Sequence, residues 1–343
     1  RSGYQRDSYL VNAHVPRFGS GEAKGVIDES VRGMDLYILV DVCNYSLTYS
    51  MSGNTNHMSP DDHYQNLKRI IAAVGGKAKR INVIMPFLYE SRQHKRSSRE
   101  SLDCALALQE LTHMGVDNII TFDAHDPRVQ NAIPLSGFET VRPTYQFVKG
   151  LLDRYDDLII DSDHMMAISP DEGATERAVY LANVLNLDMG MFYKRRDYTR
   201  VVNGRNPIVA HEFLGSSVEG KDVIILDDMI SSGDSILDVA KQLKSRNAKR
   251  IFAAATFGLF TNGLDKFDEA YESGLIDGVL TTNLIYQTPE LLSRPYYINC
   301  DMSKYVALMI DTLNHDGSIS DILDPSERIQ VCVEEYKKAH GQL

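Results

Sequence analysis

Hydrophobic and polar positions along this chain follow two alternating patterns. Short runs rich in β-branched residues recur through almost the whole sequence, and amphipathic stretches separate them. This order is typical of parallel sheets whose strands are connected by helices that cover the sheet. The runs predict strands at residues 36–40, 81–85, 118–122, 158–160, 223–226, 250–256 and 278–281. The predicted fold class is therefore α/β.

One helix can be delimited directly from the sequence. Ser59 is a typical N-cap residue, Pro60 suits the first helical position, and two acids follow in the first turn. The glycine pair at residues 75–76 is a typical helix stop. The sequence thus predicts a helix from Pro60 to about residue 74.

The chain also contains an internal repeat of the order strand, polar loop, helix, strand. Residues 81–125 form the first copy and residues 223–258 the second. In the second copy one helical face is apolar and comprises Ile236, Val239, Ala240 and Leu243. This helix should therefore pack on the sheet and direct its N-terminus toward the preceding loop. The repeat predicts two similar domains, residues 1–145 and 146–343, with the last helix able to pack back on the first domain.

Composition agrees with this organisation and excludes some partners. A chain of 343 residues suits two α/β domains, and 43% hydrophobic with 24% charged residues is ordinary for a globular protein. A net charge of −11 argues against nucleic acid as a partner, because a phosphate backbone is held by a surplus of Lys and Arg. A phosphorylated ligand would have to be held by local basic clusters, backbone amides or metal ions.

The four cysteines are scattered and show neither CxxC spacing nor a dense disulfide framework. No apolar run reaches the roughly 18 residues that a membrane span needs. The sequence therefore predicts reduced thiols, no membrane association and a cytoplasmic location.

Acidic and small polar residues follow the predicted strand 223–226. Asp227 and Asp228 come first, then the small polar run 231–235, then the predicted helix. Small residues let backbone N–H groups converge on a phosphate, and a helix N-terminus favours an anion. Acids at the carboxyl end of a strand can hold ribose hydroxyls or metal-bound water, since α/β sheets bind ligands at that edge. The residues alone leave a capped surface turn as an open alternative.

Together with other motifs, this loop resembles the ribose-phosphate pyrophosphokinase family, also called PRPP synthetase. The motifs occur in the family's order: RF at 17–18, IDESVRG, MPFLYESRQHKRSSRE, FDAHDPRVQ, AISPDEGATERA, FYKRR, LDDMISSGDS, TFGLF and TTNLI. The resemblance implies two phosphoribosyltransferase-like domains, each a mainly parallel sheet flanked by helices. It implies transfer of the pyrophosphoryl group of MgATP to the C1 hydroxyl of ribose 5-phosphate, in a homo-oligomer built from dimers and up to a hexamer.

The resemblance also assigns roles to individual residues. It implies that Lys194 and Arg196, on a polar flap extending to about residue 209, stabilise charge on the transferring group. It implies a Mg²⁺ site with His125 and Asp171. ATP would contact Arg92, Gln93, Lys95 and, from a neighbouring subunit, Glu22. Ribose 5-phosphate would contact Asp227, Asp228, Ser231, Ser232, Gly233, Asp234 and Ser235.

Simpler interpretations of these residues stay open on the sequence alone. The basic runs 92–96 and 194–196 can be solvated surface charge, His125 can be structural, and Asp171 can be a helix-capping acid. A phosphoribosyltransferase is one alternative function, although it would need only one such domain. A non-catalytic homologue that regulates an active partner is another.

The chain departs from the family pattern at several positions. Ser231 stands where the family usually has an acid, and Asp234 stands where it usually has glycine. The first change removes a charged contact to the ribose, whereas Asp234 is tolerable if its side chain faces outward. Phe257 replaces a usual histidine, and residues 44–58 look inserted.

Overall fold

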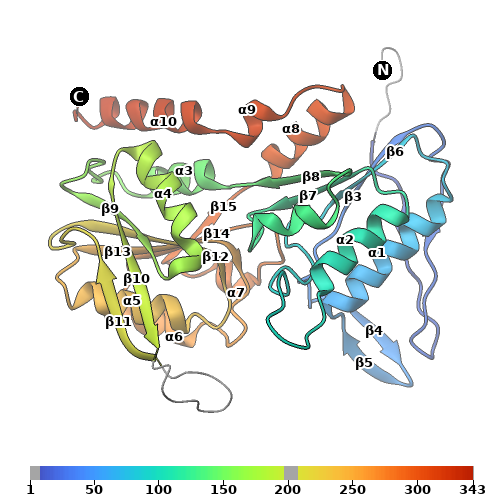
Figure 1. Ribbon diagram of the computed structural model, residues 1–343, viewed down its shortest axis with the longest axis horizontal. Helices are drawn as coiled ribbons and strands as arrows, with labels where there is room; N and C mark the ends of the chain where they lie inside the picture. The colour runs from blue at the N-terminus through green and yellow to red at the C-terminus, as the bar shows by residue number, and fades with distance from the viewer. Residues whose placement is uncertain (1–7, 197–207, 343) are drawn as a thin grey trace. The chain divides into compact units, whose positions relative to one another are not determined.

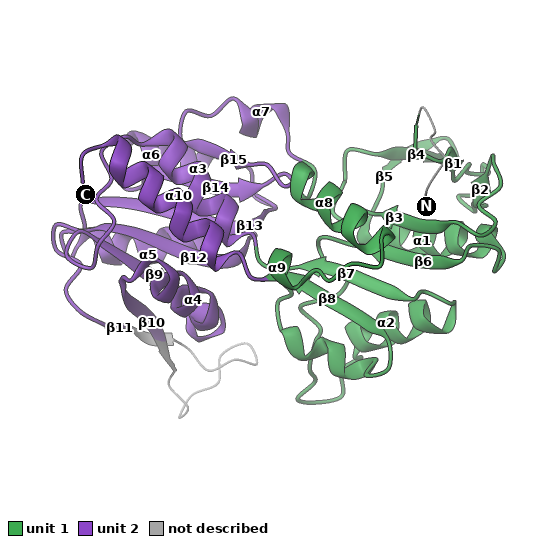
Figure 2. Ribbon diagram, turned by 90° about the horizontal axis from the view of Figure 1, so that it is seen from above, with its two compact units in different colours: residues 1–142, 284–286, 303–323 green, residues 143–283, 287–302, 324–343 purple. Residues whose placement is uncertain are grey.

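The computed structural model describes residues 8–196 and 208–342. Figure 1 labels its helices and strands. The chain forms two compact units, which are coloured separately in Figure 2. Unit 1 comprises Arg1–Arg142, Leu284–Tyr286 and Ser303–Leu323. Unit 2 comprises Pro143–Asn283, Gln287–Met302 and Asp324–Leu343.

Unit 1 is built on a four-stranded parallel sheet. Its order is β3 (Asp35–Leu39), β6 (Arg80–Ile84), β7 (Asn118–Phe122), β8 (Gly137–Val141). The helices are α1 (Pro60–Val74), α2 (Asp103–His113), α8 (Ser303–Asn314) and α9 (Ser320–Leu323), with a 3₁₀ turn η1 (Pro127–Ala132). Two small antiparallel pairs are β1 (Ala13–His14) with β2 (Val26–Ile27), and β4 (Thr48–Met51) with β5 (Asn54–His57).

Helix α1 begins and ends where the sequence predicts. The Ser59 hydroxyl accepts a hydrogen bond from the Asp62 amide over 3.2 Å, and the Asp62 carboxylate accepts one from the Ser59 amide over 3.0 Å. This reciprocal pair is a capping box. At the other end Gly75 adopts a left-handed conformation with φ of 60°. The predicted helix from Pro60 to residue 74 is confirmed.

Unit 2 contains a seven-stranded sheet in which all neighbours are parallel except one pair. The order is β11 (Ile208–Leu214), β10 (Asp188–Arg196), β9 (Met165–Ser169), β12 (Asp222–Ile230), β13 (Arg250–Gly258), β14 (Gly278–Thr282), β15 (Tyr297–Cys300). The antiparallel pair is β10 with β11. The α/β class and the parallel sheets flanked by helices are confirmed.

Helices cover both faces of the unit 2 sheet (Figure 1). Side chains at even positions of β12, such as Ile224 and Leu226, pack with α3 (Thr144–Arg154), α4 (Thr175–Leu185) and α10 (Ser326–Ala339). Odd positions, such as Val223 and Ile225, pack with α5 (Asp234–Lys244) and α6 (Asp265–Glu272). This alternation follows from the period of two along a strand, and it explains why the strand reads as one continuous apolar run. The short elements α7 (Pro289–Leu292) and η2 (Glu172–Ala174) complete the unit.

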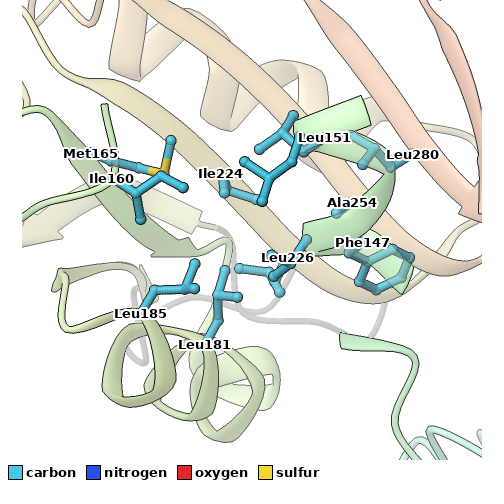
Figure 3. Close-up of a pocket in the computed structure, with 12 residues that line it drawn as sticks. Phe147, Leu151, Ile160, Met165, Leu181, Leu185, Ile224, Leu226, Ala254 and Leu280 are labelled. Atoms are coloured by element: carbon cyan, nitrogen blue, oxygen red, sulfur yellow. The ribbon is translucent and has the colours of Figure 1, made fainter. Parts of the chain in front are cut away.

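Figure 3 shows a small cavity in the first of these layers. Its volume is about 20 Å³, and every side chain that lines it is apolar, among them Phe147, Leu181 and Leu226. A cavity of this size is close to that of one water molecule, and an apolar one stays dry. It is therefore part of the packed core and does not suit a polar ligand.

The strand predicted at residues 158–160 is wrong. Leu158 and Ile160 are buried, but the strand that enters the sheet is β9, which starts at Met165. The Leu158 amide donates to the Tyr336 hydroxyl over 3.0 Å, and its carbonyl accepts from the Gln342 side chain over 2.7 Å. Side chains from the end of the chain thus satisfy the backbone groups that a strand neighbour would otherwise pair.

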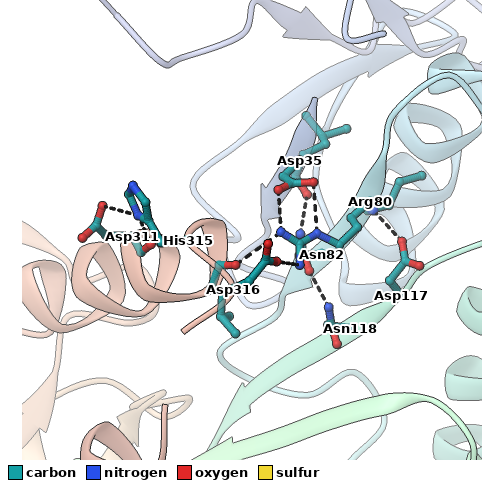
Figure 4. Close-up of polar contacts among 11 residues, drawn as sticks. Asp35, Arg80, Asn82, Asp117, Asn118, Asp311, His315 and Asp316 are labelled. Atoms are coloured by element: carbon teal, nitrogen blue, oxygen red, sulfur yellow. Dashed lines mark hydrogen bonds and ion pairs between the residues drawn. The ribbon is translucent and has the colours of Figure 1, made fainter. Parts of the chain in front are cut away.

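The structure defines two further segments. The stretch 44–58, which looks inserted, forms the β4–β5 hairpin. Residues 303–323, which the sequence places in the second domain, belong to unit 1. The Arg80 guanidinium, at the start of β6, donates to Asp316 over 2.7 Å and to the Leu313 carbonyl over 3.3 Å (Figure 4). These bonds tie the end of α8 to the first sheet.

The internal repeat is present in the fold as β6–α2–β7 and β12–α5–β13, each with its two strands parallel neighbours. The four cysteines are all free. Among the described residues, no helix combines the length and the hydrophobicity needed to cross a bilayer.

Candidate functional site

The turn that leads from β12 into α5 has a conformation that requires glycine. Gly233 precedes the first helical residue with φ of 84°, in the left-handed region. A Cβ atom at this position would overlap the ring of Phe267, which is fully buried. The turn therefore brings its backbone against α6 and directs the N-terminus of α5 at the space beyond the strand end. Backbone amides in such a turn suit a phosphate.

Asp227 and Asp228 lie inside β12, whereas the sequence places them after the strand. Asp227 is paired with Ala255 of β13, and the strand continues to Ile230. Asp228 is buried and its amide donates to the Asp227 carboxylate over 2.8 Å. Burial, and then repulsion by Asp228 and Asp171, raise the pKa of Asp227 well above its ordinary value. Such a concentration of carboxylates is stabilised by a cation or by hydroxyl donors.

Asp171 sits at the carboxyl end of β9, before η2. Its carboxylate accepts a hydrogen bond from the Gly173 amide over 2.9 Å, so it does perform the capping role that the sequence leaves open. Its negative charge also contributes to the raised pKa of Asp227, after burial and the charge of Asp228. Within the described parts of the chain, no three His, Cys, Asp or Glu side chains form a metal-binding group. Mg²⁺ needs fewer protein ligands than that, because it keeps waters and binds substrate phosphates.

The side chains of the turn itself are mostly accessible. Ser231 and Ser232 are half-buried, and Asp234 and Ser235 are exposed. The Asp234 carboxylate forms an ion pair with Lys266 of α6 and accepts a hydrogen bond from the Ser232 hydroxyl over 2.9 Å. The Asp234 side chain is thus exposed and is bonded both to the turn and to α6.

In unit 1 the corresponding loop follows β6. Arg92 and Lys95 are exposed, and Gln93 is half-buried. The Gln93 amide side chain donates to the Ser101 carbonyl over 2.7 Å, which joins the two ends of the basic loop. His125 lies three residues beyond the end of β7, at the carboxyl edge of the sheet, as its position in the sequence implies.

Three further residues, His94, Asp126 and Arg128, lie close to His125 or to one another. The His94 ring lies 5.3 Å from the His125 ring, centroid to centroid, and its Nε2 lies 3.5 Å from the Asp126 carboxylate. Burial lowers the pKa of His94. Hydrogen bonds from Arg128 lower the pKa of Asp126 to about 2. In the sequence, His94 and Asp126 are marked only by standing next to Gln93 and His125. Their contact could not be predicted from the sequence, because it joins two loops that are distant along the chain.

The remaining predicted site residues are Glu22, Lys194 and Arg196. Glu22 is exposed and accepts a hydrogen bond from the Ser20 hydroxyl over 2.9 Å. The backbones of Lys194 and Arg196 belong to β10, opposite His211 and Ile208 of β11. Their side chains, and residues 197–207 of the predicted flap, lie outside the described residues.

Each of the two units contains a mainly parallel sheet with polar loops at the carboxyl ends of its strands. In unit 2 one of these loops follows two acids of β12 and contains a left-handed glycine. These features define a protein of the phosphoribosyltransferase type. Comparisons with known proteins narrow this class. A family model described as the N-terminal domain of ribose phosphate pyrophosphokinase matches residues 5–115, and a phosphoribosyl transferase domain model matches residues 142–281. The chain belongs to the ribose-phosphate pyrophosphokinase family and is an enzyme, as the sequence predicts.

Individual relatives cover almost the whole chain. The ribose-phosphate pyrophosphokinase of Shewanella oneidensis is 30% identical over 91% of this chain and 90% of its own length. That of Mycoplasma genitalium is 31% identical over 79% of this chain and 74% of its own. The crystal structure of phosphoribosylpyrophosphate synthetase from Mycobacterium smegmatis matches with a TM-score of 0.74 and 24% identity, covering 91% of this chain and 93% of that one. The last likeness shows the fold.

Proposed function

We propose that this protein transfers the pyrophosphoryl group of ATP to the C1 hydroxyl of ribose 5-phosphate, giving phosphoribosyl pyrophosphate and AMP. The observation that carries the proposal is the connection from β12 to α5, where two acids in the last part of the strand are followed by a left-handed glycine and a helix N-terminus. Family membership over both units supports it.

The turn of unit 2 is the proposed ribose 5-phosphate site. Amides of residues 231–235 and the N-terminus of α5 hold the 5-phosphate, because backbone N–H groups and the helix dipole both favour an anion. Asp227 and Asp228 accept hydrogen bonds from the ribose hydroxyls. Ser231 offers a neutral hydroxyl in place of the acid usual in the family. Ribose is therefore held there by a weaker hydrogen bond.

Unit 1 is the proposed nucleotide side. Arg92 and Lys95 are exposed cations that bind the ATP phosphates, and the half-buried Gln93 supplies an amide fixed by its bond to Ser101. Glu22 is exposed, so it can contact an adenine bound to a neighbouring copy of the chain. This assignment needs a homo-oligomer, and we propose one built from dimers, up to a hexamer, in the cytoplasm.

Catalysis rests on positioning and on charge. The C1 hydroxyl attacks the β-phosphorus in line, so no protein nucleophile is needed. Lys194 and Arg196 offset the negative charge that develops on the transferring group. The family motif assigns this role to both residues, and both belong to β10.

His125 and Asp171 are the proposed Mg²⁺-site residues. Oxygen donors suit this hard cation, and the repulsion that Asp171 and Asp228 exert on Asp227 is relieved by positive charge. His125 is a weaker partner and would act through a water molecule. When bound, the cation neutralises phosphate charge and orients the pyrophosphoryl group.

The test is an assay of purified protein with ATP, ribose 5-phosphate and Mg²⁺, in which AMP and phosphoribosyl pyrophosphate are quantified by chromatography. Equal amounts of the two products are expected, and neither should form when one substrate is omitted or EDTA is present. No AMP from folded protein would favour a regulatory homologue that joins an active partner. Consumption of phosphoribosyl pyrophosphate with a nucleobase would favour a phosphoribosyltransferase.

A further inference from the structure

The segment after β13, residues 259–267, contacts the proposed phosphate turn at three places. The Thr261 amide donates to the Ser231 carbonyl over 3.0 Å. The Phe267 ring occupies the space that a side chain at Gly233 would need. Lys266 forms its ion pair with Asp234. The segment therefore sets both the backbone path of the turn and the charge at its end.

Asp234 creates a problem for phosphate binding that the rest of the turn does not solve. It is the first residue of α5, and a carboxylate there is attracted to the same N–H groups and the same helix dipole that favour a phosphate. It is also a like charge near the phosphate. The Ser232 hydroxyl, which donates to Asp234, shows that the carboxylate already draws on donors of the turn.

We propose that Lys266 is a positioning residue for ribose 5-phosphate, which acts by holding the Asp234 carboxylate away from the phosphate-binding amides and offsetting its charge. The inference rests on the proposed function. Lys266 reaches Asp234 from the first turn of α6, and the ring of its neighbour Phe267 lies against Gly233. Lys266, 32 positions along the chain from Asp234, thereby offsets the negative charge that Asp234 brings to a position where the family usually has glycine.

The experiment measures the affinity for ribose 5-phosphate by calorimetry, together with KM and kcat, in Lys266→Gln, Asp234→Asn and the double variant. Lys266→Gln should weaken ribose 5-phosphate binding roughly two- to fivefold at low salt, with kcat and the KM for ATP unchanged. Asp234→Asn keeps the side-chain size and removes the charge, so the double variant should recover the lost affinity. Lys266→Arg should retain it.

Lys244→Gln is the matched control, since it removes one positive charge from the far end of α5, beyond the screening length at physiological salt. It should change the affinity by less than Lys266→Gln does. An equal loss in Lys266→Gln with and without Asp234→Asn would overturn the proposal, because Lys266 would then act on the substrate directly. No loss in Lys266→Gln, with the unaltered protein binding normally, would also overturn it. If the unaltered protein fails to bind ribose 5-phosphate, the proposed function falls as well.

Discussion

Arg250 and Asp222 begin the adjacent strands β13 and β12, and the Arg250 guanidinium donates to both oxygens of the Asp222 carboxylate, over 2.9 and 2.7 Å. The two residues are register partners in the sheet. In unit 1, Arg80 and Asp35 are likewise register partners of β6 and β3 with the same two-bond pairing (Figure 4). Each sheet is thus held by an ion pair at the amino ends of its strands, while the polar loops of the proposed site occupy the carboxyl ends.

The first prediction concerns this ion pair. Asp222→Ala leaves the mostly buried Arg250 guanidinium without its main partner and should lower the free energy of unfolding by about 3 kcal/mol. Urea denaturation measures the change. Asp238→Ala, which removes the exposed partner of Lys241, should cost under about 1 kcal/mol. Equal losses in the two variants would show that burial does not decide the strength of the pair.

The second prediction is a pH dependence in unit 1. Arg128 holds the pKa of Asp126 at about 2, below the ordinary 3.8, so the fold favours the charged carboxylate. This contribution to stability is present above about pH 4 and is lost as the pH falls toward 2. Arg128→Gln should raise the pKa of Asp126 and reduce the loss of stability over that range. Carboxyl NMR titration measures the pKa, and exposed Arg99→Gln, the control, should leave it unchanged.

The third prediction separates backbone strain from steric contact in the phosphate turn. Gly233→Ala adds a Cβ in the left-handed region and against Phe267, and it should cost about 2–4 kcal/mol of stability and abolish ribose 5-phosphate binding. Gly220→Ala, also at positive φ but with open space around the added atom, should cost about 1 kcal/mol and leave binding unchanged. Thermal unfolding and calorimetry provide the two readouts. Similar behaviour of the two variants would argue against the contact with Phe267.

The fourth prediction concerns the cation on β10. Lys194→Ala should reduce turnover about a hundredfold or more while ATP binding stays nearly intact, because the residue acts mainly in the transition state. The kcat is measured by AMP release, and binding by titration with a non-hydrolysable ATP analogue. The adjacent Arg195→Ala should have a smaller effect on kcat. Unchanged turnover in Lys194→Ala would remove this residue from the mechanism.

The fifth prediction separates the two roles of Asp171. Asp171→Asn keeps an oxygen that can accept from the Gly173 amide but loses the charge, whereas Asp171→Ala loses both. If Asp171 holds Mg²⁺, both variants should raise the Mg²⁺ concentration needed for half-maximal activity, and only Asp171→Ala should also lower stability, by about 1 kcal/mol. Titration with Mn²⁺, followed by electron paramagnetic resonance, measures cation binding independently of activity. A normal cation response in Asp171→Asn would leave capping as its only role.

The sequence by itself determined the features whose causes are local. The helix at Pro60–Val74 follows from a cap, a proline and a stop glycine, and the buried face of α5 follows from the helical period. The strand at Asn118–Phe122 follows from a β-branched run between turns. The family could also be recognised from the sequence, because several separate motifs resemble it and occur in its order.

Only the tertiary structure decided which of these segments meet. Residues 158–160 were predicted as a strand, but side chains from the end of the chain satisfy the backbone groups of Leu158. Asp227 pairs with Ala255 of β13, so β12 continues through Asp228 to Ile230. The contact of His94 with His125 depends on two strand ends lying at one sheet edge. The pairing of Lys266 with Asp234 depends on α6 packing against the turn. Such contacts follow from sheet register and helix packing, which local patterns along the chain do not contain.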